Sequence, residues 1–132
     1  MGLDMYLYRG EIPKTNKMII DEENLEEVSY WRKCNQLHTW FTINVDGVDN
    51  CTYSSVTLNH CIQLVDTCKL VLTNRSTEYS QEHLPTSPGF FYGDTSYDDY
   101  YYDVVEDTIN LFETMIMQTN WDTEMLWYHP WW

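Results

Sequence analysis

The C-terminal part of this 132-residue chain lacks positive charge. All seven Lys and Arg residues lie at or before Arg75, whereas residues 76–132 hold eleven Asp and Glu residues and supply −11 of the formal net charge of −14. A surface of that sign repels nucleic-acid phosphates and anionic lipids, and it attracts basic partners. The composition therefore argues against direct binding of nucleic acid. It favours a basic protein partner, or a small ligand held in a local pocket.

Long apolar segments are also missing from the sequence. No run approaches the roughly 18 residues that a membrane span requires, and residues 1–9 lack the basic and apolar regions of a secretion signal. We therefore expect a cytoplasmic protein that does not contact membranes. In that reducing compartment the four cysteines, Cys34, Cys51, Cys61 and Cys68, should be free thiols.

The sequence contains no Cys-x-x-Cys pair and no strong catalytic motif. Cys34 and His38 could share one face of a helix and bind zinc, with Cys51, His60 or Cys61 completing the site. Both residues also lie on an apolar stripe, and cysteine is commonly buried, so we favour a core position for the pair. We expect no metal, no cofactor and no catalysis. A small hydrolase or transferase is kept as a third class of function.

The hydrophobic pattern predicts one α+β domain over residues 1–132. Hydrophobic residues make up 43% of the chain and aromatic residues 16%, which is enough to form a core. Period-two alternation predicts strands at residues 2–9 and 124–132, and we expect both in one small antiparallel sheet. A further short strand is expected at residues 17–21. Three helices should pack on this sheet.

The first helix is predicted to begin near residue 25, after a capping box at residues 24–27, and to end at Gly47. The evidence is a set of apolar residues that recur at spacings of three and four. They are Val28, Trp31, Cys34, His38, Phe41 and Val45.

The second helix is predicted to start after Ser54 or Ser55 and to extend to Leu72, because the same apolar spacing recurs there. Residues 74–95 contain two prolines and two glycines and are predicted to be a long loop, with a short strand at residues 90–92. The third helix is expected to follow a capping signature at residues 96–99.

The densest acidic stretch, residues 94–107, interleaves six carboxylates with four tyrosines. Several of them should lie on the outer face of the third helix, where carboxylates can imitate the phosphates of DNA and tyrosines can anchor a partner. A solvated helix face is the alternative interpretation, but such a face usually carries some lysine. We call this predicted partner-binding surface the acidic ridge: Asp98, Asp99, Tyr100, Tyr102, Asp103 and Glu106.

A second candidate site surrounds the only adjacent basic pair of the chain, Arg32 and Lys33. Aromatic rings could stack a planar ligand while the two cations hold a phosphate, so this site would bind a small anionic ligand of nucleotide type. The alternative is that the cations form structural ion pairs with Glu26, Glu27 or the acidic C-terminal part. The predicted ligand-binding residues are Trp31, Arg32, Lys33, His38, Trp40, Phe90, Phe91 and Tyr92.

Three motifs resemble a family of small phage and prophage proteins. They are MGLDMYL at residues 1–7, YWRKxNxxHxWF at residues 30–41 and PTxxGFFYG at residues 85–93. The family supplies no activity or catalytic residues to carry over. The resemblance does imply a phage setting, in which small accessory proteins often counter host defences or redirect host machinery. We therefore predict a non-catalytic inhibitor of a basic, nucleic-acid-handling host protein in the host cytoplasm. Sequestration of a small anionic signalling molecule is the alternative.

Overall fold

Four strands and four α-helices make up the parts of the chain that the computed structural model describes, residues 2–13, 22–89 and 93–132. A 3₁₀ turn at Glu22–Asn24 precedes the second strand. The α+β prediction is confirmed, with four α-helices in the described residues where we expected three. In chain order the elements are β1 (Asp4–Glu11), β2 (Glu26–Arg32), α1 (Asn35–Asn44), β3 (Ser54–Val56), α2 (Leu58–Asn74), α3 (Thr77–His83), α4 (Asp99–Gln118) and β4 (Glu124–Trp131).

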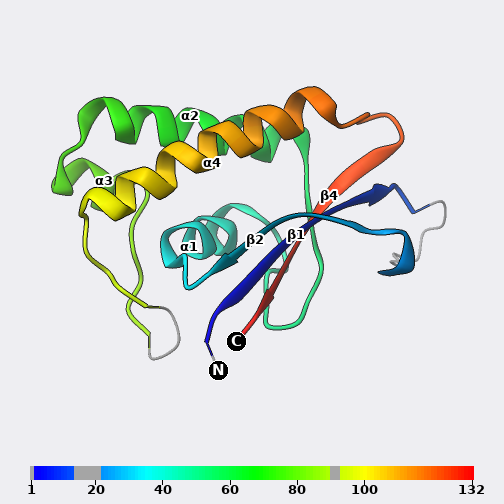
Figure 1. Ribbon diagram of the computed structural model, residues 1–132, viewed down its shortest axis with the longest axis horizontal. Coiled ribbons are helices and arrows are strands. Elements are labelled where there is room, and N and C mark those ends of the chain that lie inside the picture. The colour runs from blue at the N-terminus through cyan, green and yellow to red at the C-terminus, as the bar shows by residue number, and fades with distance from the viewer. Residues whose placement is uncertain (1, 14–21, 90–92) are drawn as a thin grey trace.

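The four strands form one antiparallel sheet in the order β2-β1-β4-β3. The two central strands come from opposite ends of the sequence, and they pair along their whole length, from Asp4 with Trp131 to Glu11 with Glu124. Figure 1 shows them running side by side through the middle of the sheet. The predicted pairing of the N-terminal and C-terminal strands is therefore confirmed.

Helices α1, α2 and α4 share one hydrophobic core with the sheet. The helices α2 and α4 lie side by side in Figure 1, above the strands. Alternation along β1 and β4 sends one set of side chains into this core, because successive residues of a strand point to opposite faces. The fully buried side chains of the core include Met5, Leu7, Phe41, Leu64, Phe112 and Leu126. No helix in the described residues is long and apolar enough to cross a membrane.

The prediction of one helix from residue 25 to Gly47 is wrong. The structure has strand β2 over Glu26–Arg32, a turn at Lys33 with φ of 55°, and then helix α1. Apolar spacing alone could not distinguish one long helix from a strand followed by a shorter helix, because a partly buried Trp31 is compatible with either structure. In β2 it pairs with Met5, and the backbone of β2 hydrogen-bonds to β1.

Other boundaries also differ from the sequence prediction. Helix α3 lies inside the predicted loop of residues 74–95, and seven residues are too few to show periodicity. The N-cap of α4 is Asp98, two residues later than expected. Strand β3 was not predicted, because three residues are too few to show a strand pattern and they form a strand only by pairing with β4. The strands predicted at residues 17–21 and 90–92 lie outside the described residues.

All four cysteines are free thiols, and they differ in exposure. Cys51 is exposed, whereas Cys34, Cys61 and Cys68 are buried. Burial raises the pKa of each of these three thiols to about 12, because a thiolate loses its hydration inside the core. The three buried cysteines therefore act as small apolar core residues at neutral pH.

We predict that a thiol-specific disulfide reagent at pH 8 modifies one cysteine per folded chain quickly, namely Cys51. All four should react after denaturation, and a Cys51→Ser variant should show no fast reaction when folded. Rapid modification of a second thiol in the folded variant would contradict the buried positions of the other three.

Candidate functional site

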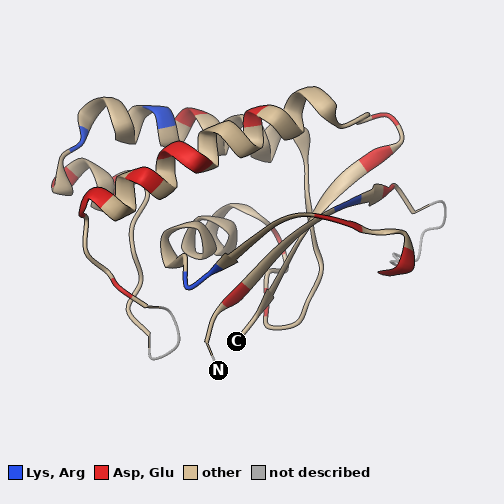
Figure 2. Ribbon diagram, viewed as in Figure 1, with Lys and Arg blue, Asp and Glu red and all other residues tan. Residues whose placement is uncertain are grey.

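The carboxylates of the acidic ridge lie at and after the start of α4. The Asp98 side chain caps the helix, since one of its oxygens accepts a hydrogen bond from the Tyr101 backbone N–H at 3.0 Å. Asp99, Asp103 and Glu106 are exposed and form no ion pair with any described residue. Figure 2 shows acidic residues along α4 and no Lys or Arg on that helix. The ridge is therefore an anionic surface without an internal counter-ion among the described residues.

Two described cations, Arg9 and Lys69, form ion pairs with carboxylates outside the ridge. Arg9 contacts Glu26 at 2.8 Å across the β1–β2 pair. Lys69 of α2 contacts Glu113 at 2.9 Å, so it neutralises the C-terminal half of α4 and not the ridge. Both pairs include an exposed partner, and such pairs contribute little to stability.

The tyrosines of the ridge point in different directions. Tyr100 is 71% exposed, whereas Tyr102 is 6% exposed. The Tyr102 hydroxyl lies 2.9 Å from the Ser80 hydroxyl, and the Arg75 guanidinium lies 5.2 Å from the centre of its ring. Two residues along a helix are separated by about 200° of rotation, so these two side chains cannot share a face. Tyr102 therefore belongs to the core, and Tyr100 alone is available to a partner.

The predicted ligand-binding residues that the structure describes do not line one common pocket. Trp31 and Arg32 line a groove of about 280 Å³ between β2 and α4, together with Tyr100 and Asp107. The side chains of His38 and Trp40 are buried in the core, at 2% and 5% exposure. Residues 90–92, which include the other three predicted aromatic residues, lie outside the described residues.

Arg32 and Lys33 do not form the structural ion pairs that we considered. Glu26, one of the proposed acceptors, pairs with Arg9. Neither basic residue of the pair forms an ion pair with a described residue, and both are exposed. Lys33 packs its aliphatic part beneath Gly93, where an added Cβ would come within 2.9 Å of the Lys33 Cβ.

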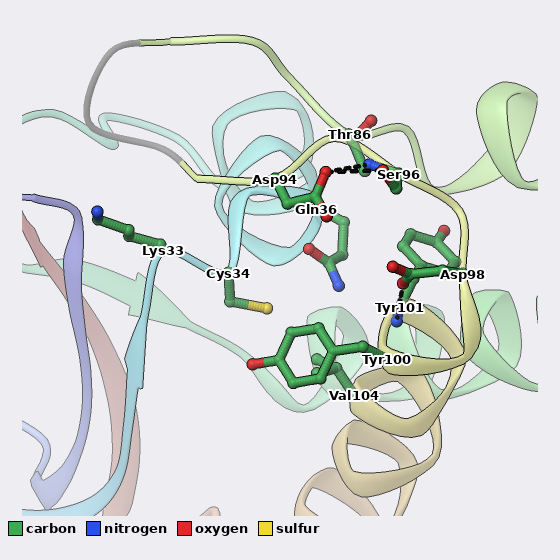
Figure 3. A pocket seen from close by; sticks show the side chains of 10 residues that line it. All are labelled: Lys33, Cys34, Gln36, Thr86, Asp94, Ser96, Asp98, Tyr100, Tyr101 and Val104. Atoms are coloured by element: carbon green, nitrogen blue, oxygen red, sulfur yellow. Dashed lines mark hydrogen bonds between the residues drawn. The ribbon is translucent and has the colours of Figure 1, made fainter.

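A smaller hollow of about 50 Å³ adjoins the groove, at the corner where β2 meets α1. Cys34, Tyr100 and Val104 line both spaces. Figure 3 shows the hollow between the first turn of α1 and the start of α4, with the loop of Asp94 and Ser96 closing one side. Hydrogen bonds from Ser96 lower the pKa of the Asp94 carboxyl, so it is ionised at neutral pH.

One residue that sequence reasoning missed, Asn35, holds this loop in place. It is fully buried, and its amide donates to the Asp94 carbonyl at 2.8 Å and accepts from the Ser87 backbone N–H at 3.0 Å. Two parts of the loop are thereby tied to the start of α1. The only sequence signal was a strongly polar residue at the start of an apolar helix.

Comparisons of the chain with protein-family models, with curated proteins and with solved structures gave no match.

His38 is a structural residue of the core, as Cys34 is, and the expected burial of the pair is confirmed. Its Nδ1 lies 2.7 Å from the Tyr128 hydroxyl. Burial lowers the pKa of His38 from 6.5 to about 4, because the charged imidazolium is poorly solvated there. The ring is therefore neutral at pH 7.

This pKa shift predicts a pH dependence of stability. The unfolded chain binds a proton at His38 below pH 6.5, whereas the folded chain resists it until about pH 4, so stability should fall as the pH drops through this window. We expect a loss of about 3 kcal/mol relative to a His38→Gln variant, measured by urea unfolding at a series of pH values. Parallel pH profiles for the two proteins would show that the folded state does not exclude the proton.

Proposed function

We propose that this protein is a non-catalytic phage accessory that binds and inhibits a basic, nucleic-acid-handling protein of the host cell. The binding surface is the acidic ridge on α4 without Tyr102. The observation that carries the proposal is the exposure of Asp99, Asp103 and Glu106 on a helix face with no cation among the described residues. Carboxylates held on such a face attract a basic surface and speed its approach.

Two further features support a binding role. Tyr100 stands exposed beside these carboxylates, and tyrosine is one of the residues that contribute most to protein interfaces. The thiol beside the groove, Cys34, has a pKa of about 12 and so is not a nucleophile at neutral pH. The resemblance to small phage proteins suggests the host cell as the place of action.

The proposal predicts that a triple variant, Asp99→Asn, Asp103→Asn and Glu106→Gln, loses its partner but keeps its fold. Removing like charges relieves repulsion of ~0.2–0.5 kcal/mol per pair, and losing Asp99 from the helix start costs about as much, so the free energy of unfolding should change by less than about 1 kcal/mol. Asp98 is left in place because it caps α4. The matched control is Glu11→Gln, Asp46→Asn and Asp122→Asn, which removes the same charge from exposed positions off the ridge.

The measurement is retention of host-lysate proteins on each immobilised protein, followed by nucleic-acid binding assays of the proteins retained. Wild type and control should retain a basic protein, release it steeply as salt rises past ~0.15 M, and block its binding to nucleic acid. Equal retention by the ridge variant, or undiminished nucleic-acid binding by the retained protein, would contradict the proposal.

A second candidate function is sequestration of a small anionic molecule of nucleotide type. It is favoured by Arg32, which lines the groove beside Trp31 and forms no ion pair with a described carboxylate. A planar base could stack on the indole ring while the guanidinium binds a phosphate.

This second function predicts that a linear or cyclic nucleotide raises the melting temperature of the wild-type protein. A ligand at 100 times its dissociation constant stabilises by about 2.7 kcal/mol, which is a shift of several degrees. An Arg32→Gln variant should lose the shift. If no nucleotide shifts the melting temperature at millimolar concentration, this candidate is excluded.

A further inference from the structure

The hollow beside Tyr100 is lined by the polar side chain of Gln36. Gln36 lies in the first turn of α1 and is 6% exposed. Its amide forms no hydrogen bond with a described residue, and Figure 3 shows it pointing into the space above the Tyr100 ring. A group that enters the hollow can therefore hydrogen-bond to this amide in place of water.

The carboxylates that line the hollow favour a positively charged ligand. Asp94 is held in its charged form by Ser96, and only one oxygen of Asp98 is occupied by its hydrogen bond with the backbone of Tyr101. Lys33 lines the rim, but Figure 3 shows its ammonium directed away from the hollow. The charged groups that line the hollow are therefore the exposed carboxylates of Asp94 and Asp98 and, with its ammonium turned away, Lys33.

Aromatic rings complete the walls. The exposed Tyr100 ring lies along one side, and a cation within about 6 Å of a tyrosine ring is attracted to its face. Tyr101 contributes only its ring, because its hydroxyl donates to the Leu84 carbonyl at 2.6 Å. A flat cation could therefore lie against Tyr100 with its edge toward the carboxylates.

The volumes of the two spaces limit which ligands can fit. Pockets for small molecules usually measure about 300–1,000 Å³. The hollow measures about 50 Å³, which suits a single functional group, and the adjoining groove of about 280 Å³ can hold the chain that carries it. A guanidinium is planar and has five N–H donors, so it can bind both carboxylates and the Gln36 carbonyl together, whereas a lysine ammonium is a point charge.

We propose that this hollow receives an arginine side chain of the basic protein partner. This inference rests on the proposed function, because the arginine belongs to the basic partner that binds the acidic ridge. The guanidinium binds Asp94, Asp98 and Gln36 and stacks on Tyr100, and its aliphatic stem lies in the groove beside Trp31.

The first test uses a small probe in place of the partner. Nα-acetyl-arginine methylamide should shift the side-chain amide signals of Gln36 in an NMR titration that saturates in the millimolar range. Nα-acetyl-citrulline methylamide has the same shape without the charge and should cause no saturable shift. An equal response to citrulline, or arginine shifts that do not saturate and spread over all acidic residues, would overturn the proposal.

Substitutions test the named groups. Asp98→Asn removes the charge while the asparagine can still cap α4, so the fold is preserved. This variant should weaken binding of the arginine probe at least about fivefold, and Gln36→Leu should do the same. The reason is that hydrogen bonds to a charged group are stronger than hydrogen bonds between neutral groups. Asp122→Asn, beyond the other end of α4, is the matched control and should change binding less than about twofold. If the Asp98 variant binds the probe as tightly as the control does, the hollow is not an arginine site.

Octa-arginine and octa-lysine peptides separate this proposal from the ridge function. The ridge should bind both peptides, and the triple ridge variant should weaken both while leaving the arginine probe bound. If octa-lysine does not bind the wild-type protein but octa-arginine binds and the arginine probe saturates, the ridge function fails and the arginine site stands. If both peptides bind equally and the probe does not saturate, the ridge stands and the arginine site fails.

Discussion

The burial of Tyr128 fixes helix α1 on the sheet. Its ring is fully buried on the central strand β4 and stacks on Phe41 at a centroid distance of 4.1 Å. Its hydroxyl needs a partner in the core and finds it in His38, on the same helix. Two contacts one turn apart prevent α1 from sliding or rotating. Because the first turn of this helix forms the floor of the hollow, the position of Gln36 depends on the same constraint.

The two faces of helix α4 differ: one packs in the core and stabilises the fold, and the other carries exposed carboxylates. One face carries Val105 and Phe112 into the core, and fully burying a side chain of that kind contributes about 1.5–3 kcal/mol. The outer face carries carboxylates that repel one another by a few tenths of a kcal/mol per pair. The packing outweighs the repulsion, so the fold needs no cation beside Asp99 and Asp103. The charge remains available to another molecule.

The sequence predicted those elements whose pattern is long and local. Strands β1 and β4 and helices α2 and α4 followed from periodicity, with shifts at the ends. Strand β2 was missed because its apolar spacing also fits a helix. Tyr102 was assigned to the ridge because it lies among carboxylates in the sequence, but the helix turns its side chain into the core. The hollow could not be predicted, since it exists only when Asn35 ties a distant loop to the start of α1.

The strand order also affects how fast the chain can fold. Strand β3 pairs only with β4, and β4 lies beside β1, so the sheet depends on contacts between residues about 120 positions apart. Topologies dominated by such distant contacts fold slowly, because loop closure must precede the gain from pairing. Helix α4 is built from local contacts, whereas the floor of the hollow depends on the contacts of Tyr128 with α1, which are distant in sequence. The exposed carboxylates of α4 therefore need fewer long-range contacts to be in place than the hollow does.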